Sequence, residues 1–357
     1  MKSFSVVLAG GSGTRFWPLS RIGSPKQVLN ISGNDVMINE TIRRTEGLIA
    51  FEDCFIVTAK SQLSQIDGVL LPEVPRANIL MEPVQRNTAP CILFAALKLK
   101  RLYGEGVMCI FSADHYITNG DEFKRVIESA SKLAETTDKL VTLGIRPSYP
   151  ATGYGYISYD RAAATGEAFD VLEFVEKPSY ERAAQYCRDG SYLWNSGIFI
   201  WRISSILAAF ERYLPRLYKR LLPWCDLIGT EREEEALAEI YPTLQKISID
   251  FGILERSNDV LVIPSDFGWS DVGSWDSLGA IFPPDEAGNI VRADELIPID
   301  TTDNIIYSER QLISTIGIHD MIVVSTEDAL LLCPKNRAQD VRKIVDRLTE
   351  LDMKKYL

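Results

Sequence analysis

The stretch LAGGSGTRFWPLSRIGSPKQ, from Leu8 to Gln27, places four glycines directly after a short apolar run. The run from Phe4 to Leu8 is bounded by glycines and is typical of a buried strand that leads into a tight turn. Glycines at the end of a strand leave backbone N–H groups free to face a ligand, and a helix N-terminus after them would add a positive dipole. We interpret residues 8–27, here called the N-terminal loop, as a cradle for a phosphate chain.

Two common glycine motifs do not fit this loop. A P-loop has Lys and then Ser or Thr after its last glycine, but Thr14 and Arg15 follow Gly13. A dinucleotide fingerprint requires a third glycine where Phe16 stands. A flexible turn without a ligand is the plain alternative. The cations Arg15 and Lys26 count against that alternative.

The composition limits the partners that the chain can have. Its 357 residues carry a net charge of −11, which makes nucleic acid and anionic membranes poor candidate partners. An anionic substrate must then be met by local cations or by a metal ion. The six cysteines form no CxxC pair and only two histidines are present, which argues against structural zinc. We find no signal peptide and no membrane-spanning run, and expect a soluble cytoplasmic protein with reduced thiols.

Strand-like runs alternate with amphipathic stretches up to about residue 144. This alternation predicts an α/β fold, a Rossmann-like mixed, mostly parallel sheet flanked by helices, over residues 1–282. The carboxyl ends of such strands would bring the N-terminal loop next to SADHYI, residues 112–117. After PPDEAGN, residues 283–289, short β-rich segments predict a small C-terminal domain over residues 289–357. A β-helix is one form it could take.

An amphipathic helix is predicted to close the C-terminal domain. It would carry one apolar stripe, made of Val341, Ile344, Val345, Leu348 and Leu351. We expect this stripe to dock on its own domain rather than on a partner.

Six further motifs follow the N-terminal loop, which ends in PKQ, and they are EPVQRNTAP, SADHYI, YPATGYGYI, FVEKP, WNSGIF and GWSDVGSW. In this order and over essentially the whole chain, the sequence resembles the bacterial mannose-1-phosphate guanylyltransferases. The resemblance implies a nucleotide-diphospho-sugar transferase fold and the transfer of GMP from GTP to α-D-mannose 1-phosphate with Mg²⁺, giving GDP-mannose and pyrophosphate. Some members carry a further isomerase domain. Because the sequence ends at Leu357, we expect no mannose-6-phosphate isomerase activity from it.

Such a transfer needs neutralisation of negative charge and in-line alignment rather than a general base. Mg²⁺ prefers one or two carboxylates together with phosphate oxygens and water. Asp114 follows a buried strand and Asp271 lies among small residues, and the resemblance implies that both hold the metal. A helix N-cap is the alternative role for Asp114. The catalytic residues implied by the resemblance are Arg15, Lys26, Lys177, Asp114 and Asp271.

The resemblance also implies two groups of binding residues. Those for the nucleotide are Leu8, Ala9, Gly10, Gly11, Ser12, Gly13, Thr14, Arg15, Glu82, Asn87 and Thr88. Those for the sugar are Tyr154, Gly155, Glu176, Lys177, Asn195 and Asp271. Which of Glu82, Arg86, Asn87 and Thr88 reads the guanine stays open, because all four could instead cap the following helix. We interpret His115 as a packing or supporting residue, since Mg²⁺ favours oxygen.

Two other functions fit the same motifs. One is a pyrophosphorylase for another sugar 1-phosphate or another base, because its phosphate and metal residues would look the same. The other is a non-catalytic homologue that binds nucleotide sugars and regulates a partner. We expect small-molecule partners, GTP and mannose 1-phosphate, with no nucleic acid and no membrane. We also expect a homo-oligomer, a dimer through the C-terminal domain.

Overall fold

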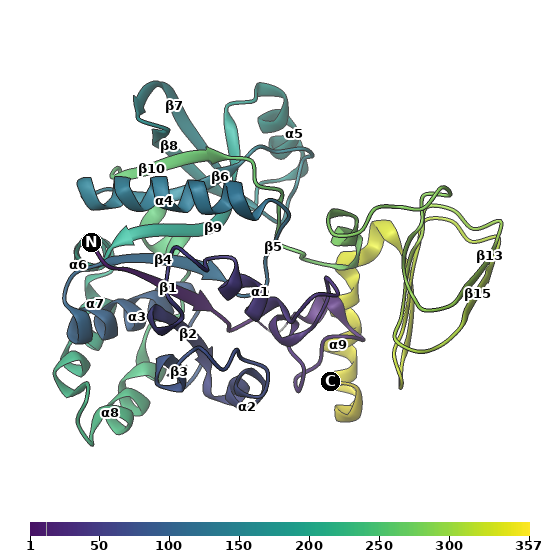
Figure 1. Ribbon diagram of the computed structural model, residues 1–357, viewed down its shortest axis with the longest axis horizontal. Helices are drawn as coiled ribbons and strands as arrows, with labels where there is room; N and C mark the ends of the chain where they lie inside the picture. The colour runs from purple at the N-terminus through teal and green to yellow at the C-terminus, as the bar shows by residue number, and fades with distance from the viewer. Residues whose placement is uncertain (12) are drawn as a thin grey trace.

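The computed structural model describes residues 1–11 and 13–357, so the predicted nucleotide-binding residue Ser12 lies outside the described residues. A nine-stranded sheet forms the body, in the order β3-β2-β1-β4-β9-β6-β10-β8-β7 (Figure 1). Its strands are β1 (Ser3–Leu8), β2 (Cys54–Ala59), β3 (Ile79–Glu82), β4 (Val107–Ser112), β6 (Leu140–Ile145), β7 (Gly155–Thr165), β8 (Ala168–Glu176), β9 (Tyr192–Arg202) and β10 (Val260–Ser265). Strands β3, β2, β1 and β4 are parallel, as are β6 and β10, while the other neighbours are antiparallel. The predicted α/β class with a mixed sheet is confirmed, although parallel pairs do not form the majority that we expected.

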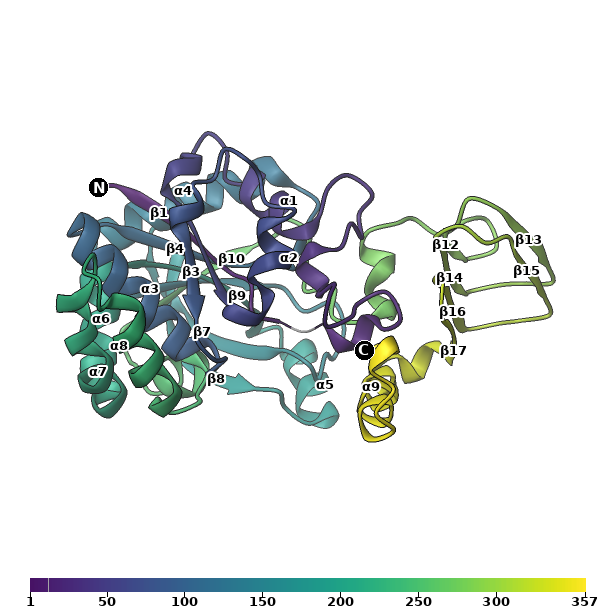
Figure 2. The same cartoon turned by 90° about the horizontal axis from the view of Figure 1, so that it is seen from below.

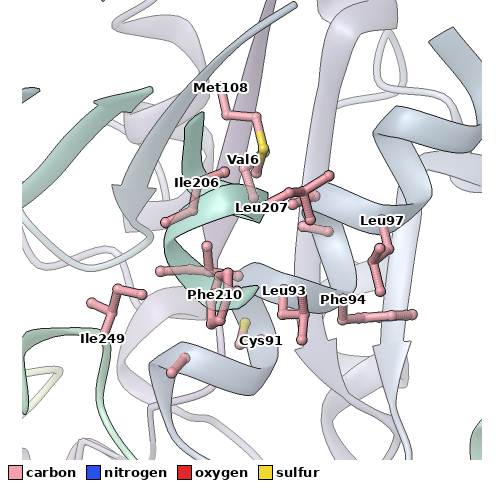
Figure 3. Packing of buried hydrophobic residues seen from close by; sticks show 14 of the residues in the cluster. Val6, Cys91, Leu93, Phe94, Leu97, Met108, Ile206, Leu207, Phe210 and Ile249 are labelled. Atoms are coloured by element: carbon pink, nitrogen blue, oxygen red, sulfur yellow. The ribbon is translucent and has the colours of Figure 1, made fainter. Parts of the chain in front are cut away.

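Helices cover both faces of the sheet. Alternate residues of β1 face opposite ways. Val6 packs with α3 and α6 (Figure 3), whereas Val7 packs with α1 and α2. A strand buried on both faces can carry consecutive apolar residues, as Val6, Val7 and Leu8 do in β1. The helices of this body are α1 (Met37–Arg43), α2 (Leu63–Asp67), α3 (Thr88–Tyr103), α4 (Gly120–Thr136), α5 (Tyr180–Asp189), α6 (Ile203–Tyr213), α7 (Pro215–Leu221) and α8 (Glu233–Ile240).

Within residues 13–36, no α-helix follows the glycines of the N-terminal loop, contrary to our prediction. The loop instead contains two single 3-10 turns, η1 (Thr14–Phe16) and η2 (Lys26–Val28), and the first α-helix begins at Met37. Pro18 and Pro25 explain the difference, because a proline disfavours helical geometry in the residue before it. Any phosphate held here would therefore be bound by backbone N–H groups without the dipole of a long helix.

The C-terminal part winds through two small sheets, β12-β14-β16-β17 and β13-β15 (Figure 2). Its strands are β12 (Ile290–Arg292), β13 (Leu296–Ile299), β14 (Ile305–Ser308), β15 (Ile313–Ile316), β16 (Met321–Ser325) and β17 (Leu330–Pro334). All neighbours are parallel except β16 and β17. Asn304 is fully buried and links successive coils, since its Oδ1 accepts from the Met321 N–H and its Nδ2 donates to Asn289. The β-rich character predicted for this part is confirmed.

The last helix, α9 (Val341–Glu350), lies between the β-rich part and the body (Figure 2). Its apolar stripe packs into one cluster with β17 and also with Phe16 and Trp17 of the N-terminal loop. The indole N–H of Trp17 donates to the backbone oxygen of Tyr356 over 2.8 Å. Our prediction that the helix docks on its own domain was therefore incomplete. Leu351 stays exposed because the helix ends at Glu350.

Candidate active site

A cavity of about 480 Å³ opens at the carboxyl ends of β1 and β4. These two strands are parallel, with Leu8 opposite Ser112, and the N–H of Ala113 donates to the Leu8 oxygen over 3.0 Å. This pairing places the N-terminal loop beside residues 112–117, as predicted from the sequence. We call this cavity the cleft.

Lys26 joins the two aspartates that the sequence singled out. Its side chain is only 3% exposed, and its Nζ donates to Asp114 Oδ2 (3.0 Å), to the Asp114 oxygen (2.9 Å) and to the Asp271 oxygen (2.7 Å). An ammonium group has three donors, so all of them bind protein groups here. Lys26 therefore bridges two distant segments of the chain. Its expected contact with the phosphates stays a prediction.

The fold of the N-terminal loop makes this bridge possible. Gly13 has a φ of +62°, and a Cβ at this position would lie 2.5 Å from the Cβ of Lys26. A side chain there would push the lysine stem out of its buried position, so the close approach requires glycine.

Asp114 is held in its ionised form. The hydroxyl of Ser112 donates to its Oδ1 over 2.6 Å, and Lys26 contacts its Oδ2. Desolvation alone would raise the pKa of Asp114, but the charge of Lys26 and the Ser112 hydrogen bond together hold it below its ordinary value. The side chain remains 28% exposed, so it can still reach a ligand.

Asp271 faces the same cleft from the other side. The hydroxyl of Tyr154 donates to its Oδ1 over 2.8 Å. A Cβ on Gly273 would lie 2.7 Å from its Oδ2, so the glycine leaves room for the carboxylate. Burial and the nearby Asp271 charge raise the pKa of Tyr154, which therefore stays a hydrogen-bond donor at neutral pH. Val272 follows with a φ of +45°.

The predicted sugar-binding residues gather at the ends of β7, β8 and β9. A Cβ on Gly155 would lie 2.5 Å from the Glu176 Oε2, so only glycine lets this carboxylate lie against the strand. Asn195 donates to Asp250 Oδ1 over 2.8 Å. Burial, and then the negative charge of Glu176, raise the pKa of Asp250 to about 6. Lys177 lies at the rim, 63% exposed, with its Nζ 2.6 Å from Glu176 Oε1.

Strained backbone surrounds the cleft. Asn87, Lys177 and Val272 all have positive φ angles, of 69°, 47° and 45°. Such conformations cost about 1–3 kcal/mol each for non-glycine residues and persist where the surroundings enforce them, often at functional sites. In this protein each of the three directly adjoins a side chain of the predicted sites, Thr88, Glu176 or Asp271.

The far end of the cleft contains one buried carboxylate. Glu82 is 4% exposed, accepts the Tyr241 hydroxyl on Oε1, and has its Oε2 on the side of Gly10. Arg86 turns away and donates to the Pro242 oxygen. Burial raises the pKa of Glu82 to about 7, although the Tyr241 hydrogen bond opposes the rise.

Two further candidates at this end accept backbone N–H groups, and one of them, Asn87, is the N-cap of α3. Asn87 Oδ1 accepts from the Thr88 N–H, and Thr88 Oγ1 accepts from the Ile249 N–H. Of the candidates for reading guanine, Glu82 is thus the one whose side chain makes the fewest hydrogen bonds to backbone groups.

The raised pKa of Glu82 makes the stability of the protein depend on pH. Because the pKa lies near 7 in the folded state against 4.5 in the unfolded state, the folded protein binds the proton more tightly. The resulting stability is present below about pH 4.5 and is lost as the pH rises through 7. The free energy of unfolding of Glu82→Gln, taken relative to that of the parental protein, should therefore be about 2 kcal/mol larger at pH 8 than at pH 5. Urea unfolding at both pH values measures this, and a constant difference would contradict the assignment.

The structure brings most predicted site residues together. Those that line the cleft are Leu8, Gly10, Gly11, Glu82, Asn87, Thr88, Tyr154, Gly155, Glu176, Asn195 and Asp271. Ala9 is buried, and its oxygen accepts from the side chains of Gln27 and Thr58. Thr14 belongs to a separate hollow beside α9.

Arg15 is also outside the cleft. It lines a second cavity of about 710 Å³, which shares Tyr154 and Asp271 with the cleft, and its Nη1 donates to Gln339 Oε1 over 2.9 Å.

Sequence reasoning missed several residues of the cleft, above all Lys246 and Asp250. Both come from the segment 246–254, which the sequence placed in no motif. The only available signal was an isolated Asp in an apolar stretch. His115, which we interpreted as a supporting residue, lines the cleft and accepts the indole N–H of Trp269 on Nδ1 over 3.2 Å. Burial lowers its pKa, so it is the neutral acceptor that this contact requires.

The fold and the cleft are those of a nucleotidyltransferase, and the family model "Nucleotidyl transferase" matches residues 4–287. A second model, "MannoseP isomerase/GMP-like beta-helix domain", matches residues 294–348. The chain belongs to the mannose-1-phosphate guanylyltransferase family. It is 38% identical to the mannose-1-phosphate guanylyltransferase of Escherichia coli K12 and 39% identical to that of Salmonella muenchen, over 97% of this chain and 73% of each relative.

Two solved structures share this fold. A Thermus thermophilus protein described as a mannose-1-phosphate geranyltransferase has a TM-score of 0.89 at 31% identity, covering 98% of this chain and all of the other. A Helicobacter pylori mannose-6-phosphate isomerase shares the fold, with a TM-score of 0.60 at 22% identity over 76% of this chain and all of the other. Within the described residues, every helix is too short or too polar to span a bilayer.

Proposed function

We propose that this chain transfers GMP from GTP to α-D-mannose 1-phosphate. A phosphate oxygen of the sugar bonds to the α-phosphorus of GTP, the bond from that phosphorus to the bridging oxygen of the β-phosphate breaks, and pyrophosphate leaves with GDP-mannose as product. One observation carries the proposal. Lys26 joins Asp114 to Asp271 beside a cleft that Asp271 lines, with a buried Glu82 at one end and Glu176 with Asn195 at the other.

The donor set of the cleft fits Mg²⁺. Within residues 1–11 and 13–357, no three His, Cys, Asp or Glu side chains form a group that could hold a metal alone. Two carboxylates remain, and Mg²⁺ typically takes one or two carboxylates plus substrate phosphates and water. Asp114 and Asp271 would hold it. When bound, the ion supplies positive charge that offsets the negative charge gathering on the phosphates.

The protein's own residues bind and orient the substrates. Backbone N–H groups around Gly10 and Gly11 face the phosphate chain, and Arg15 contacts it from the second cavity. Glu176 accepts two hydroxyls of the sugar, with Asn195 beside it and Lys177 directed to the sugar phosphate. Tyr154 holds the Asp271 carboxylate in place.

These roles also suggest a division of the chain. Residues 1–282 form the catalytic domain in this proposal, and residues 289–357 form the β-rich C-terminal domain. Several large apolar side chains of the latter are exposed, including Ile297, Ile299 and Ile316, which supports self-association through this domain.

Glu82 is the residue that we propose reads guanine. Guanine presents N1–H and N2–H₂ donors, and a carboxylate is an acceptor without donors. Tyr241 occupies Oε1, so Oε2 remains available toward Gly10. A site that pairs with substrate donors discriminates strongly against a base that lacks them, because its buried acceptor would be left unpaired.

Glu82→Gln is expected to lower kcat/KM for GTP by about a hundredfold, since the amide N–H₂ repels the donors of guanine. The rate with ATP should fall little, so the preference for GTP over ATP narrows. Pyrophosphate release with each nucleotide measures both rates. Glu73→Gln, which makes the same change at an exposed carboxylate outside the cleft, is the control for expression and folding. An unchanged GTP preference would show that another residue reads the base.

The reaction itself is tested by adding Mg²⁺, GTP and a panel of sugar 1-phosphates and measuring pyrophosphate release. Fastest release with mannose 1-phosphate supports the proposal. Faster release with another sugar or with another nucleotide would assign the chain to a different pyrophosphorylase. No release with any pair, together with binding of GDP-mannose, would favour a regulatory binding protein.

A further inference from the structure

One side chain of the C-terminal part touches both loops of the candidate active site. Gln339 lies in the 3-10 helix η10 (Lys335–Asp340), between β17 and α9. Its Oε1 accepts from Arg15 Nη1 over 2.9 Å, and its Nε2 donates to Ser274 Oγ over 2.8 Å. Arg15 belongs to the N-terminal loop, and Ser274 comes three residues after Asp271. A single amide therefore joins the two segments that we assign to phosphate and metal.

The hydrogen bonds of this group have a fixed direction. The buried Ser274 hydroxyl donates to Asp276, so its oxygen is free to accept from Gln339 Nε2. The amide must then present its carbonyl oxygen to Arg15, because the reversed amide would place N–H₂ against a guanidinium that has no acceptor. The hydrogen bonds thus run from the Arg15 cation through the neutral Gln339 and Ser274 side chains to the Asp276 carboxylate. Such chains polarise one another, and bonds to charged groups are the stronger ones.

Arg15 keeps most of its donors in this arrangement. A guanidinium has five N–H donors, and among the described residues Gln339 is the hydrogen-bond acceptor found for it. Arg15, Ser274, Asp276 and Gln339 all line the second cavity, which also reaches Tyr154 and Asp271. The remaining N–H groups of Arg15 therefore lie in the wall of the second cavity, which extends to Asp271 at the proposed reaction centre.

Other contacts hold the backbones of the two loops without Gln339. The indole N–H of Trp275 donates to the Trp17 oxygen over 3.0 Å, and the rings of Phe16 and Trp275 lie 5.1 Å apart. Trp17 in turn donates to the Tyr356 oxygen. Removing the Gln339 amide should then free the Arg15 side chain while leaving the loops in place.

We propose that Gln339 is a positioning residue, which holds the Arg15 guanidinium toward the phosphates of GTP. The β-rich C-terminal part thereby contributes to nucleotide binding by the catalytic domain. This inference rests on the proposed function, because it takes Arg15 as a phosphate ligand. A flexible arginine must lose side-chain entropy when it binds phosphate, and a residue that orders it beforehand lowers that cost.

Gln339→Ala tests the proposal, with Asn336→Ala as the matched control. Asn336 is an exposed amide in the same 3-10 helix, and among the described residues no hydrogen bond involves its side chain. We expect Gln339→Ala to lower kcat/KM for GTP by about three- to tenfold, the range for a hydrogen bond to a charged group in an exposed setting. KM for mannose 1-phosphate and the midpoint of thermal unfolding should match those of the control. A rate equal to or above that of the parental chain would overturn the proposal.

A double-mutant cycle separates positioning from a general structural effect. If Gln339 acts through Arg15, Gln339→Ala should change kcat/KM by less than about twofold in the Arg15→Ala background. An equal loss in both backgrounds would contradict this. GTP binding by calorimetry, in the same four proteins, gives a second readout that needs no turnover. Failure of the parental chain to release pyrophosphate would reject the proposed function, whereas weaker GTP binding by Gln339→Ala only when Arg15 is present would still support this inference.

Discussion

Asp271→Asn is expected to lower the rate of GDP-mannose formation by about a thousandfold, the scale found when a group that stabilises transition-state charge is removed. The amide keeps the shape of the side chain and an oxygen for the Tyr154 hydroxyl, which now donates to Oδ1. It removes the negative charge that a divalent ion requires. Pyrophosphate release at saturating GTP and mannose 1-phosphate measures the loss.

Asp266→Asn provides the control for Asp271→Asn. Asp266 is exposed and lies five residues earlier, so the substitution makes the same change in net charge away from the cleft. Its rate should match that of the parental protein. If Asp271→Asn retained more than a tenth of the parental rate, Asp271 would not be a ligand of the catalytic metal. Combining Asp271→Asn with Asp114→Asn should lower the rate little further, because the effects of residues that act as one unit are not additive.

Lys26→Met is expected to lower the free energy of unfolding by about 3 kcal/mol and the rate by more than a hundredfold. Removing one partner of a buried ion pair leaves the other charge uncompensated, which is the costly outcome. The ammonium also donates to the backbone oxygens of Asp114 and Asp271, so its loss loosens both metal-binding segments. Urea unfolding and pyrophosphate release measure the two effects.

A second substitution separates these two effects of Lys26→Met. Asp114→Asn in the Lys26→Met background removes the uncompensated charge and should recover much of the stability without recovering activity. Lys60→Met, on an exposed lysine, controls for the loss of a cation. Unchanged stability of Lys26→Met would show that Asp114 is solvated well enough to need no partner.

The sequence predicted the meeting of the N-terminal loop with residues 112–117, because parallel strands bring their carboxyl ends to one edge. It could not predict the partners of Lys26. Exposed lysines and buried bridging lysines look alike in sequence, and the difference arises only when Gly13 lets the loop fold onto the lysine stem. Asp250 was missed for a similar reason. Its π-helical segment, Asp250–Leu254, reaches the cleft through packing and carries no local motif.

The sequence by itself determined the class of fold, the order of the strands along the chain and the kinds of side chain available for phosphate, metal and sugar. Local patterns suffice for these because strand and turn preferences act over a few residues. Only the tertiary structure decided that Lys26 is a bridge, that Arg15 is held by Gln339 and that α9 packs on the N-terminal loop. These contacts join residues far apart in the chain, and their geometry depends on how the hydrophobic clusters pack, which no local pattern encodes.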